Sequence, residues 1–282
     1  LTKHGEESLR SLIQGATPWP VAGIRDASEF REKAMTLYEE GMDRGLKLDI
    51  EGLDNIFRAF PQTLTTFTGV PGSGKSSFLT FLSVNLASKY GWGSVVLSAE
   101  TPTEIHVLQM ASVYLGKSFH GEGKMSEKEL AVGLDWVEDN FTFLDESDCD
   151  VDSILDRASV AIMRHGARIL QIDPYNFLSI DGNHENSVSQ INTMLIRLKN
   201  WSISHDACCW LVAHPTKQYR GHDGKMPSVD GYSISGSSGF YNTSDGGYSV
   251  YRDDSGETRV ECWKSRFPWI GSVGDCSLTF DS

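Results

Sequence analysis

The segment of residues 69–76 has the residue types and spacing of a phosphate-binding loop. It reads Gly-Val-Pro-Gly-Ser-Gly-Lys-Ser, a glycine followed four residues later by Gly-Lys-Ser. Small residues let backbone N–H groups turn toward an anion. Lys75 can reach the β- and γ-phosphates of a nucleoside triphosphate, and the Ser76 hydroxyl can ligate Mg²⁺. We therefore predict that ATP or another nucleoside triphosphate binds here with Mg²⁺. The predicted binding residues are Gly69, Pro71, Gly72, Ser73, Gly74, Lys75, Ser76 and Ser77.

Two carboxylates follow runs that are typical of buried strands. Asp173 ends the run 169–173, where a second Mg²⁺-holding carboxylate is expected in such ATPases, although a strand-terminal Asp is also a common turn residue. Glu100 follows the run 95–99. A Glu there can orient or deprotonate an attacking water, or it can lie in the first turn of a helix. Because the carboxyl ends of parallel strands share one sheet edge, both side chains are candidates for the nucleotide site.

His214 follows a further apolar run, residues 210–213. It is placed to sense the γ-phosphate by a hydrogen bond and to relay its loss to the next loop. A lone histidine is more often structural, so the position alone decides little.

Basic residues in the second half of the chain suggest two further contacts. Lys217, Arg220 and Lys225 lie in the long segment 215–239 among glycines and a tyrosine, which suits a single-stranded nucleic acid or a solvated loop. Lys264 and Arg266 alternate along a strand and so share a face. They are either solvated or reach a nucleotide held by another subunit, as arginine fingers do.

The elements that must position these residues alternate between strand and helix. Apolar strand-like runs cover 64–68, 94–98, 141–144, 168–173 and 208–213, and helical patterns cover 76–87, 151–165 and 187–205. This alternation predicts an α/β fold with a mostly parallel sheet and helices on both faces. After Gly246 the pattern changes to antiparallel strands at 248–251, 258–263 and 276–280, with a hairpin turn at 253–256.

An amphipathic helix precedes this α/β region. Asp26 and Glu29 have the spacing of a capping box, and the helix should end near Gly41 or Gly45. One face carries Phe30, Ala34, Leu37, Tyr38 and Met42. The helix can pack on its own core or serve as a linker that docks on a neighbouring subunit, and the sequence leaves both open.

Composition limits the class of protein. The chain has 282 residues and a hydrophobic content of 39%, so we expect one main domain with an N-terminal extension. Its formal net charge of −13 argues against a general basic surface for binding duplex DNA. The sequence contains no run of about eighteen apolar residues, so it predicts no membrane span. The five cysteines lack metal-site spacing, which favours reduced thiols and a cytoplasmic location. The chain starts at Leu1 without a signal segment and is expected to be a fragment.

The order of these motifs resembles the hexameric replicative DNA helicases of the RecA-like superfamily 4, which include the DnaB type, the phage primase–helicases and the mitochondrial Twinkle type. The resemblance covers most of 52–281. The sequence His214-Pro215 is similar to the phage and Twinkle branch, where the DnaB type usually carries Gln. The matching pieces are 69–76, 98–100, 171–174, 213–217, 234–237 and 264–266.

The resemblance implies a role for each matched residue. Asp173 and Ser76 would hold Mg²⁺, Glu100 would activate water, and His214 would sense the γ-phosphate. Arg266, helped by Lys264, would act on the ATP of a neighbouring subunit. Loops near 179–187 and 217–235 would line a channel for single-stranded DNA, with 5′ to 3′ translocation in a homo-hexameric ring and a primase as a partner.

The resemblance also implies a domain order. Residues 1–25 would be the remnant of a primase-type region, 26–48 the linker helix and 49–282 the RecA-like ATPase domain. The expected compartment is the cytoplasm of a bacterium or of a phage-infected host. The alternative is an organelle such as the mitochondrial matrix. Two other functions stay open: a RecA-type recombinase whose DNA binding is regulated by ATP, and a nucleotide-gated assembly ATPase without a DNA role.

Overall fold

A computed structural model describes residues 25–180, 187–216, 229–236, 238–252 and 256–279. The chain divides into two compact units, Leu1–Met42 and Asp43–Ser282. Among the described residues, no helix has the length and apolar character that crossing a bilayer requires.

The first unit contains the amphipathic helix. A 3₁₀ turn, η1 (Ala27–Phe30), leads into α2 (Arg31–Glu40). The predicted capping box is present: the Asp26 carboxylate accepts a hydrogen bond from the Ser28 N–H (2.8 Å), and the Glu29 carboxylate accepts one from the Asp26 N–H (3.0 Å). The helix ends at Gly41, whose φ of 87° suits glycine. Every side chain of α2 is exposed.

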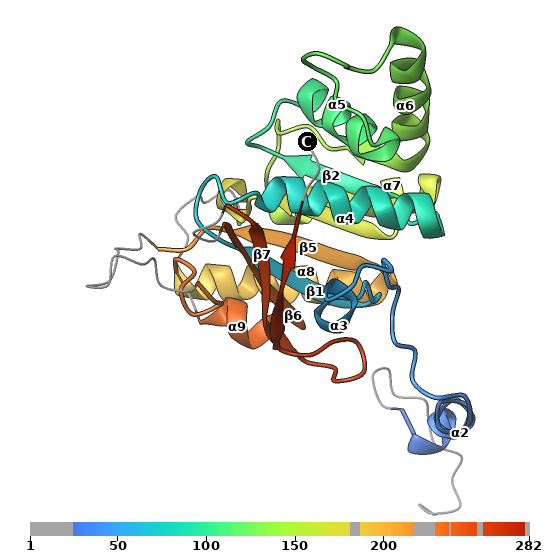
Figure 1. The fold of residues 1–282 in the computed structure, drawn as a ribbon. Coiled ribbons are helices and arrows are strands. Elements are labelled where there is room, and N and C mark those ends of the chain that lie inside the picture. Colours follow the sequence, from blue (N-terminus) through green and yellow to red (C-terminus); the bar gives the residue numbers. More distant parts are fainter. Residues whose placement is uncertain (1–24, 181–186, 217–228, 237, 253–255, 280–282) are drawn as a thin grey trace, which may run out of the picture. The chain divides into compact units, whose positions relative to one another are not determined.

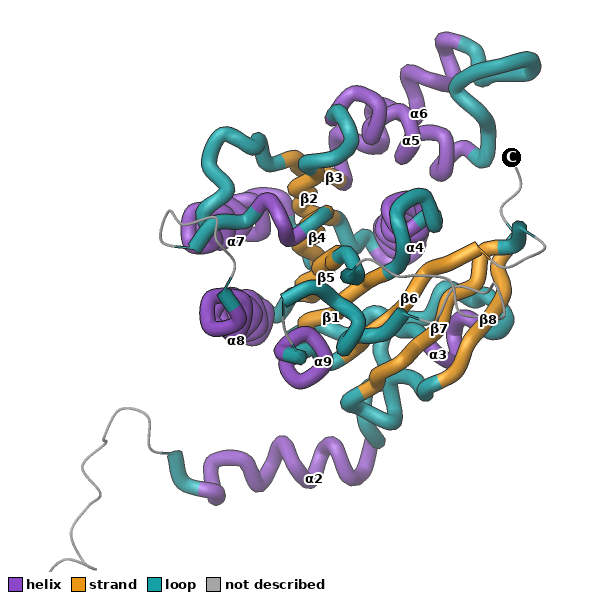
Figure 2. The backbone as a smooth tube through the Cα atoms, turned by 90° about the vertical axis from the view of Figure 1, so that its left-hand side faces the viewer, coloured by secondary structure: helices purple, strands orange, loops and turns teal. Residues whose placement is uncertain are grey.

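The second unit is built on one eight-stranded sheet with the order β3-β2-β4-β5-β1-β6-β7-β8 (Figures 1 and 2). The strands from β3 to β6 run parallel, and β7 and β8 are antiparallel additions. The strands are β1 (Thr63–Thr68), β2 (Ser94–Ser98), β3 (Phe141–Phe143), β4 (Ile169–Asp173), β5 (Cys208–Ala213), β6 (Gly246–Arg252), β7 (Thr258–Ser265) and β8 (Gly274–Leu278). The predicted α/β class is confirmed. One detail differs, since β6 is parallel to β1 as well as antiparallel to β7. The residues 253–255 of the predicted hairpin turn lie outside the described part.

Helices cover both faces of this sheet because its central strands alternate apolar side chains between the two faces. The helices are α3 (Leu53–Ile56), α4 (Lys75–Tyr90), α5 (Thr103–Leu115), α6 (Glu127–Asn140), α7 (Val151–His165), α8 (Val188–Ser204) and α9 (Gly239–Thr243), with the 3₁₀ turn η2 (Tyr175–Phe177) after β4. On β5, Cys209 and Leu211 belong to the core cluster under α7 and α8, whereas Trp210 and Val212 belong to the cluster under α4.

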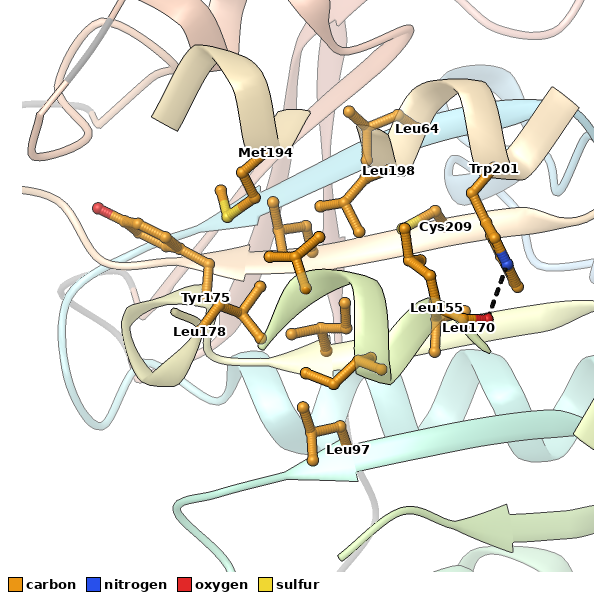
Figure 3. Packing of buried hydrophobic residues seen from close by; sticks show 14 of the residues in the cluster. Leu64, Leu97, Leu155, Leu170, Tyr175, Leu178, Met194, Leu198, Trp201 and Cys209 are labelled. Carbon is orange, nitrogen blue, oxygen red and sulfur yellow. Dashed lines mark hydrogen bonds between the residues drawn. The ribbon is translucent and has the colours of Figure 1, made fainter. Parts of the chain in front are cut away.

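Figure 3 shows the cluster on the α7 and α8 side. Leu97, Leu170 and Cys209 come from three strands and are fully or almost fully buried against the two helices. Trp201 of α8 donates its indole N–H to the Leu155 carbonyl of α7 (3.2 Å). This bond pairs a buried polar group while joining the two helices that cover this face.

Helices α5 and α6 form a pair on the opposite side, next to α4. Ser126 and Glu129 make a capping box at the start of α6. Tyr114 and Trp136 stack with ring centroids 4.0 Å apart, and a Cβ on Gly133 would lie 3.0 Å from the Cβ of Ala111. The close approach of the two helices therefore depends on a glycine.

The cysteines are free thiols. Cys208 and Cys209 lie in β5 and are fully buried. Burial raises the pKa of Cys208 to about 12, which keeps the unreactive thiol form at neutral pH.

Candidate nucleotide-binding site

The register of the sheet brings four candidate residues to one edge. Ser98 pairs with Asp173, and Thr68 pairs with Ala213. Glu100, Asp173, His214 and Gly69 therefore stand at or just beyond the carboxyl ends of the neighbouring strands β2, β4, β5 and β1. In open α/β sheets this edge is where ligands bind.

The phosphate-loop residues connect β1 to α4. Gly69 has a φ of 148°, and a Cβ there would lie 2.2 Å from the Val250 carbonyl oxygen, so no larger residue fits. Gly74 (φ 94°) caps the N-terminus of α4. The free N–H groups and the positive end of this sixteen-residue helix therefore face the loop.

Lys75 begins α4 and folds back onto the loop. Its Nζ donates to the carbonyl oxygens of Gly69 (2.9 Å) and Val70 (3.0 Å), and the residue is only 6% exposed. Burial lowers the pKa of Lys75, while the nearby carboxylates of Asp173 and Glu100 oppose that shift. An ammonium group held by two neutral carbonyls can exchange them for phosphate oxygens with an electrostatic gain.

Ser76 and Asp173 provide oxygen atoms for a divalent cation. The Ser76 hydroxyl donates to Asp173 Oδ2 (2.6 Å), and Oδ1 of this 3% exposed carboxylate has no hydrogen-bond partner among the described residues. Burial raises the pKa of Asp173, the Ser76 bond lowers it, and the charge of Glu100 raises it further. A hydroxyl and a carboxylate with a free lone pair fit Mg²⁺, which takes one or two protein oxygens and completes its shell with phosphates and water. Within the described residues, no group of three or more metal-binding side chains offers an all-protein cage.

Glu100 and His214 contact each other. His214 Nε2 lies 3.1 Å from Glu100 Oε1, in hydrogen-bonding geometry. The side chain of Glu100 is 47% exposed, so it borders solvent from which a water can be taken. The predicted water-activating group and the predicted phosphate sensor are thus joined by a hydrogen bond.

Lys264 and Arg266 lie at the other edge of the sheet. Thr65, near the start of β1, pairs with Gly246, and Gly246 pairs with Ser265. The four steps along the strand from Thr65 to Gly69 span about 13 Å. Lys264 aligns through Gly247 with Thr66, three steps or about 10 Å from Gly69, so both cations are separated from their own phosphate loop. Lys264 Nζ donates to the carbonyls of Tyr241 and Asn242. Arg266 Nη2 donates to the Asn242 carbonyl (2.9 Å).

Two residues near Arg266 had no signal in the sequence. Asp245 is a buried carboxylate between α9 and β6, and Lys199 of α8 forms an ion pair with it. Neither belongs to a motif, and the loop and helix that hold them meet only in the folded chain.

The predicted DNA-contacting residues Lys217, Arg220 and Lys225 lie outside the described residues.

Comparison with known proteins places this geometry in a family. The AAA domain family model matches residues 51–220. The chain belongs to the AAA domain family. It is 31% identical, over its whole length, to the Twinkle homolog protein, chloroplastic/mitochondrial, of Arabidopsis thaliana, and it spans 42% of the length of that relative.

Solved structures share the fold. A structure described as an ATPase domain superposes with a TM-score of 0.74 at 18% identity, covering 90% of this chain and 95% of that one. A DnaB-like replicative helicase, described with its interactions with primase, has a TM-score of 0.72 at 18% identity and covers 99% of this chain and 70% of the other. The predicted resemblance to the replicative helicases of superfamily 4, helicase portion, is confirmed.

Proposed function

We propose that this chain is the ATP-hydrolysing motor portion of a replicative DNA helicase. The observation that carries the proposal is the division of the site between two sheet edges. The phosphate loop, Asp173, Glu100 and His214 share one edge, and Arg266 and Lys264 share the other. A nucleotide site at one edge is complete only when a second copy of the chain places its Arg266 and Lys264 there, as in-trans arginine fingers do.

Each residue then has a role in phosphoryl transfer. Lys75 would bind the β- and γ-phosphates, and Ser76 and Asp173 would hold Mg²⁺, which would neutralise charge on the phosphate oxygens. Glu100 leaves its contact with His214 and accepts a proton from the attacking water. His214 becomes free to donate to the γ-phosphate. Arg266, with Lys264, stabilises the charge that develops on the nucleotide of the neighbour.

We further propose the assembly and the partners that the family resemblance implies. Copies of the chain form a homo-hexameric ring, with the region 26–48 as the linker between subunits. Single-stranded DNA passes through the centre against the segment that holds Lys217, Arg220 and Lys225, with 5′ to 3′ movement. A primase is the expected replication partner, and the domain order of 1–25, 26–48 and 49–282 belongs to the same proposal. The Arabidopsis relative is named for chloroplast and mitochondrion, and a cytoplasmic location stays a prediction.

The test is steady-state ATP hydrolysis by the purified chain, with and without single-stranded DNA. Turnover that rises strongly with DNA supports a translocating motor. Lys75→Ala should abolish turnover, and normal turnover in that variant would overturn the site. Turnover without any response to DNA would instead favour an assembly ATPase. Stimulation by DNA without strand displacement by the protein would favour a recombinase-type filament.

A further inference from the structure

Asp245 lies at the centre of a buried charge cluster beside Arg266. The residue is 4% exposed, and its Oδ2 accepts a hydrogen bond from the Leu64 backbone N–H (2.9 Å). Lys199 Nζ also donates to Oδ2. On the other side, Arg266 Nε lies 3.2 Å from Oδ1. One carboxylate therefore joins β1, α8 and the end of β7.

The backbone of Arg266 is fixed by the same residue. The Arg266 N–H donates to the Asp245 carbonyl (2.8 Å), and the Asp245 N–H donates to the Leu64 carbonyl (2.7 Å). These two bonds tie the start of the arginine side chain to the first residues of the central strand β1. The position from which the guanidinium extends is therefore defined relative to the sheet.

The guanidinium itself is held by a hydrogen bond from Nη2 to the Asn242 carbonyl (2.9 Å) and by the ion pair with Asp245. The Arg266 side chain is 44% exposed, against 2% for the Asp245 side chain. The contact between them is an ion pair that leaves Oδ1 without a hydrogen bond among the described residues. The Asp245 contact is an attraction without a directional bond, so it can orient the arginine beside the Asn242 hydrogen bond and still be exchanged for a phosphate.

Stability alone does not require this arrangement. Lys199, whose side chain is 18% exposed, already provides a cation for the buried carboxylate. A second cation that is nearly half in solvent adds little stability, because exposed ion pairs are screened by water. Ordering a long side chain before it meets its target, by contrast, lowers the entropy cost of reaching a productive geometry.

We propose that Asp245, supported by Lys199, is a positioning residue that orients Arg266 toward the nucleotide of a neighbouring copy. The inference rests on the proposed in-trans action of Arg266. It adds a residue that touches no nucleotide and acts only through the finger.

The test mixes variants that are defective in different parts of the site. Asp245→Asn keeps an oxygen for the Leu64 N–H but removes the negative charge. We expect unchanged ATP binding, unchanged assembly with a non-hydrolysable analogue, and turnover lowered by about tenfold or more. A 1:1 mixture with Lys75→Ala should recover activity. In a random mixture, about a quarter of the interfaces join an intact phosphate loop to an intact finger.

Two reference mixtures separate the inference from the function on which it rests. Arg266→Ala with Lys75→Ala should also recover activity, while Asp245→Asn with Arg266→Ala should not, because both lack a working finger. Recovery with Arg266→Ala but none with Asp245→Asn would show that Asp245 supports its own phosphate loop through β1, and would overturn the inference. Failure of the Arg266→Ala mixture would overturn the in-trans function and the inference together.

A second variant covers the case in which Asp245→Asn does not fold, as judged by its thermal melting. Lys199→Met removes the supporting cation and leaves both the carboxylate and Arg266 in place. We expect a smaller loss of turnover with the same recovery by Lys75→Ala. A loss that this mixture does not restore would contradict the positioning role.

Discussion

At the scale of single residues, the site is a set of polar groups that are paired with other groups of the chain. Lys75 is bonded to loop carbonyls, Ser76 to Asp173, and Glu100 to His214. The first two contacts pair buried polar groups, whereas Glu100 also borders solvent. Each can also be replaced by a contact to phosphate, metal or water, so binding exchanges bonds without requiring the fold to open.

Replacing Glu100 tests this view directly. Glu100→Gln keeps the size and the hydrogen bond to His214 but cannot accept a proton from water. We expect ATP hydrolysis to fall by about 10²-fold or more while binding of an ATP analogue stays unchanged. Steady-state turnover and a fluorescent-nucleotide titration measure the two properties.

Glu104→Gln is the matched control, since Glu104 is exposed in the first turn of α5. It should turn over ATP like the parent chain. Near-normal turnover by Glu100→Gln would exclude Glu100 as the base.

At the scale of elements, helix α5 packs on α4 through a buried histidine. His106 Nε2 lies 3.1 Å from the Thr80 hydroxyl, and the residue is 2% exposed. Burial lowers the pKa of His106 to about 4. Burial therefore favours the neutral imidazole where α5 covers the phosphate-loop helix.

Acid should weaken this contact. Below pH 6.5 the unfolded chain binds a proton at this histidine and the folded chain does not, so stability falls as pH drops from about 6.5 toward 4. From pH 7.5 to pH 5 the loss from this group should be about 2 kcal/mol in the free energy of unfolding. Urea unfolding of the parent chain and of His106→Gln at both pH values measures it as a difference.

His165→Gln, at an exposed histidine at the end of α7, is the control and should retain the full acid loss. An acid loss in His106→Gln as large as in the parent chain would contradict the assignment.

Helix α2 is an element whose apolar face is exposed in this chain. Leu37 is 40% and Tyr38 85% exposed. If this face docks on a neighbouring copy, Leu37→Asp with Tyr38→Asp should weaken self-association by at least about tenfold, because a buried unpaired carboxylate is costly. Light scattering with a non-hydrolysable ATP analogue measures the assembly.

Thr36→Asp is the control for charge on the same helix and should assemble normally. Unchanged assembly of the double variant would exclude this face as the linker contact.

The elements also show what the sequence could predict. Strands β2 and β5 and helix α7 have the predicted bounds, because apolar runs and end signals define them locally. The sequence predicts an antiparallel strand at 248–251, and β6 does pair antiparallel with β7. Its parallel pairing with β1 is visible only in the folded sheet. The convergence of Glu100 and His214 follows from strand order, which periodicity does not specify. Asp245 and Lys199 are brought together from distant segments and have no local pattern at all.

At the scale of the whole molecule, the negative net charge limits how the chain could bind a nucleic acid. A formal net charge of −13 opposes binding of a polyanion. Binding must then depend on a few local cations, and Lys217, Arg220 and Lys225 are the predicted ones.

Salt dependence tests that prediction. Changing these three residues to Gln should reduce the slope of log affinity against log salt for single-stranded DNA by about 0.7 per lost phosphate contact, or about 2 in all. ATP hydrolysis without DNA should be retained. Fluorescence anisotropy across a salt series measures the slope.

A variant with Gln at the exposed residues Lys124, Lys128 and Arg164 removes the same amount of positive charge elsewhere. It should keep the parent slope. Equal slopes in both variants would show that the contacts lie in another part of the chain.

The separation of the phosphate loop from Arg266 along the strands of the sheet has a consequence for how copies could assemble. If Arg266 acts on the nucleotide of a neighbouring copy, as proposed, each copy has a receiving edge and a donating edge. Its contact with the next copy is then head-to-tail and cannot be made by a two-fold pair that matches like with like. An open row always contains one fewer complete site than it has members, with an unused donor at one end and an unfinished site at the other. Only a closed circle uses every donor. ATP hydrolysis per copy should therefore measure closure of the assembly. At a fixed amount of protein, it should rise toward its maximum as open rows close into circles.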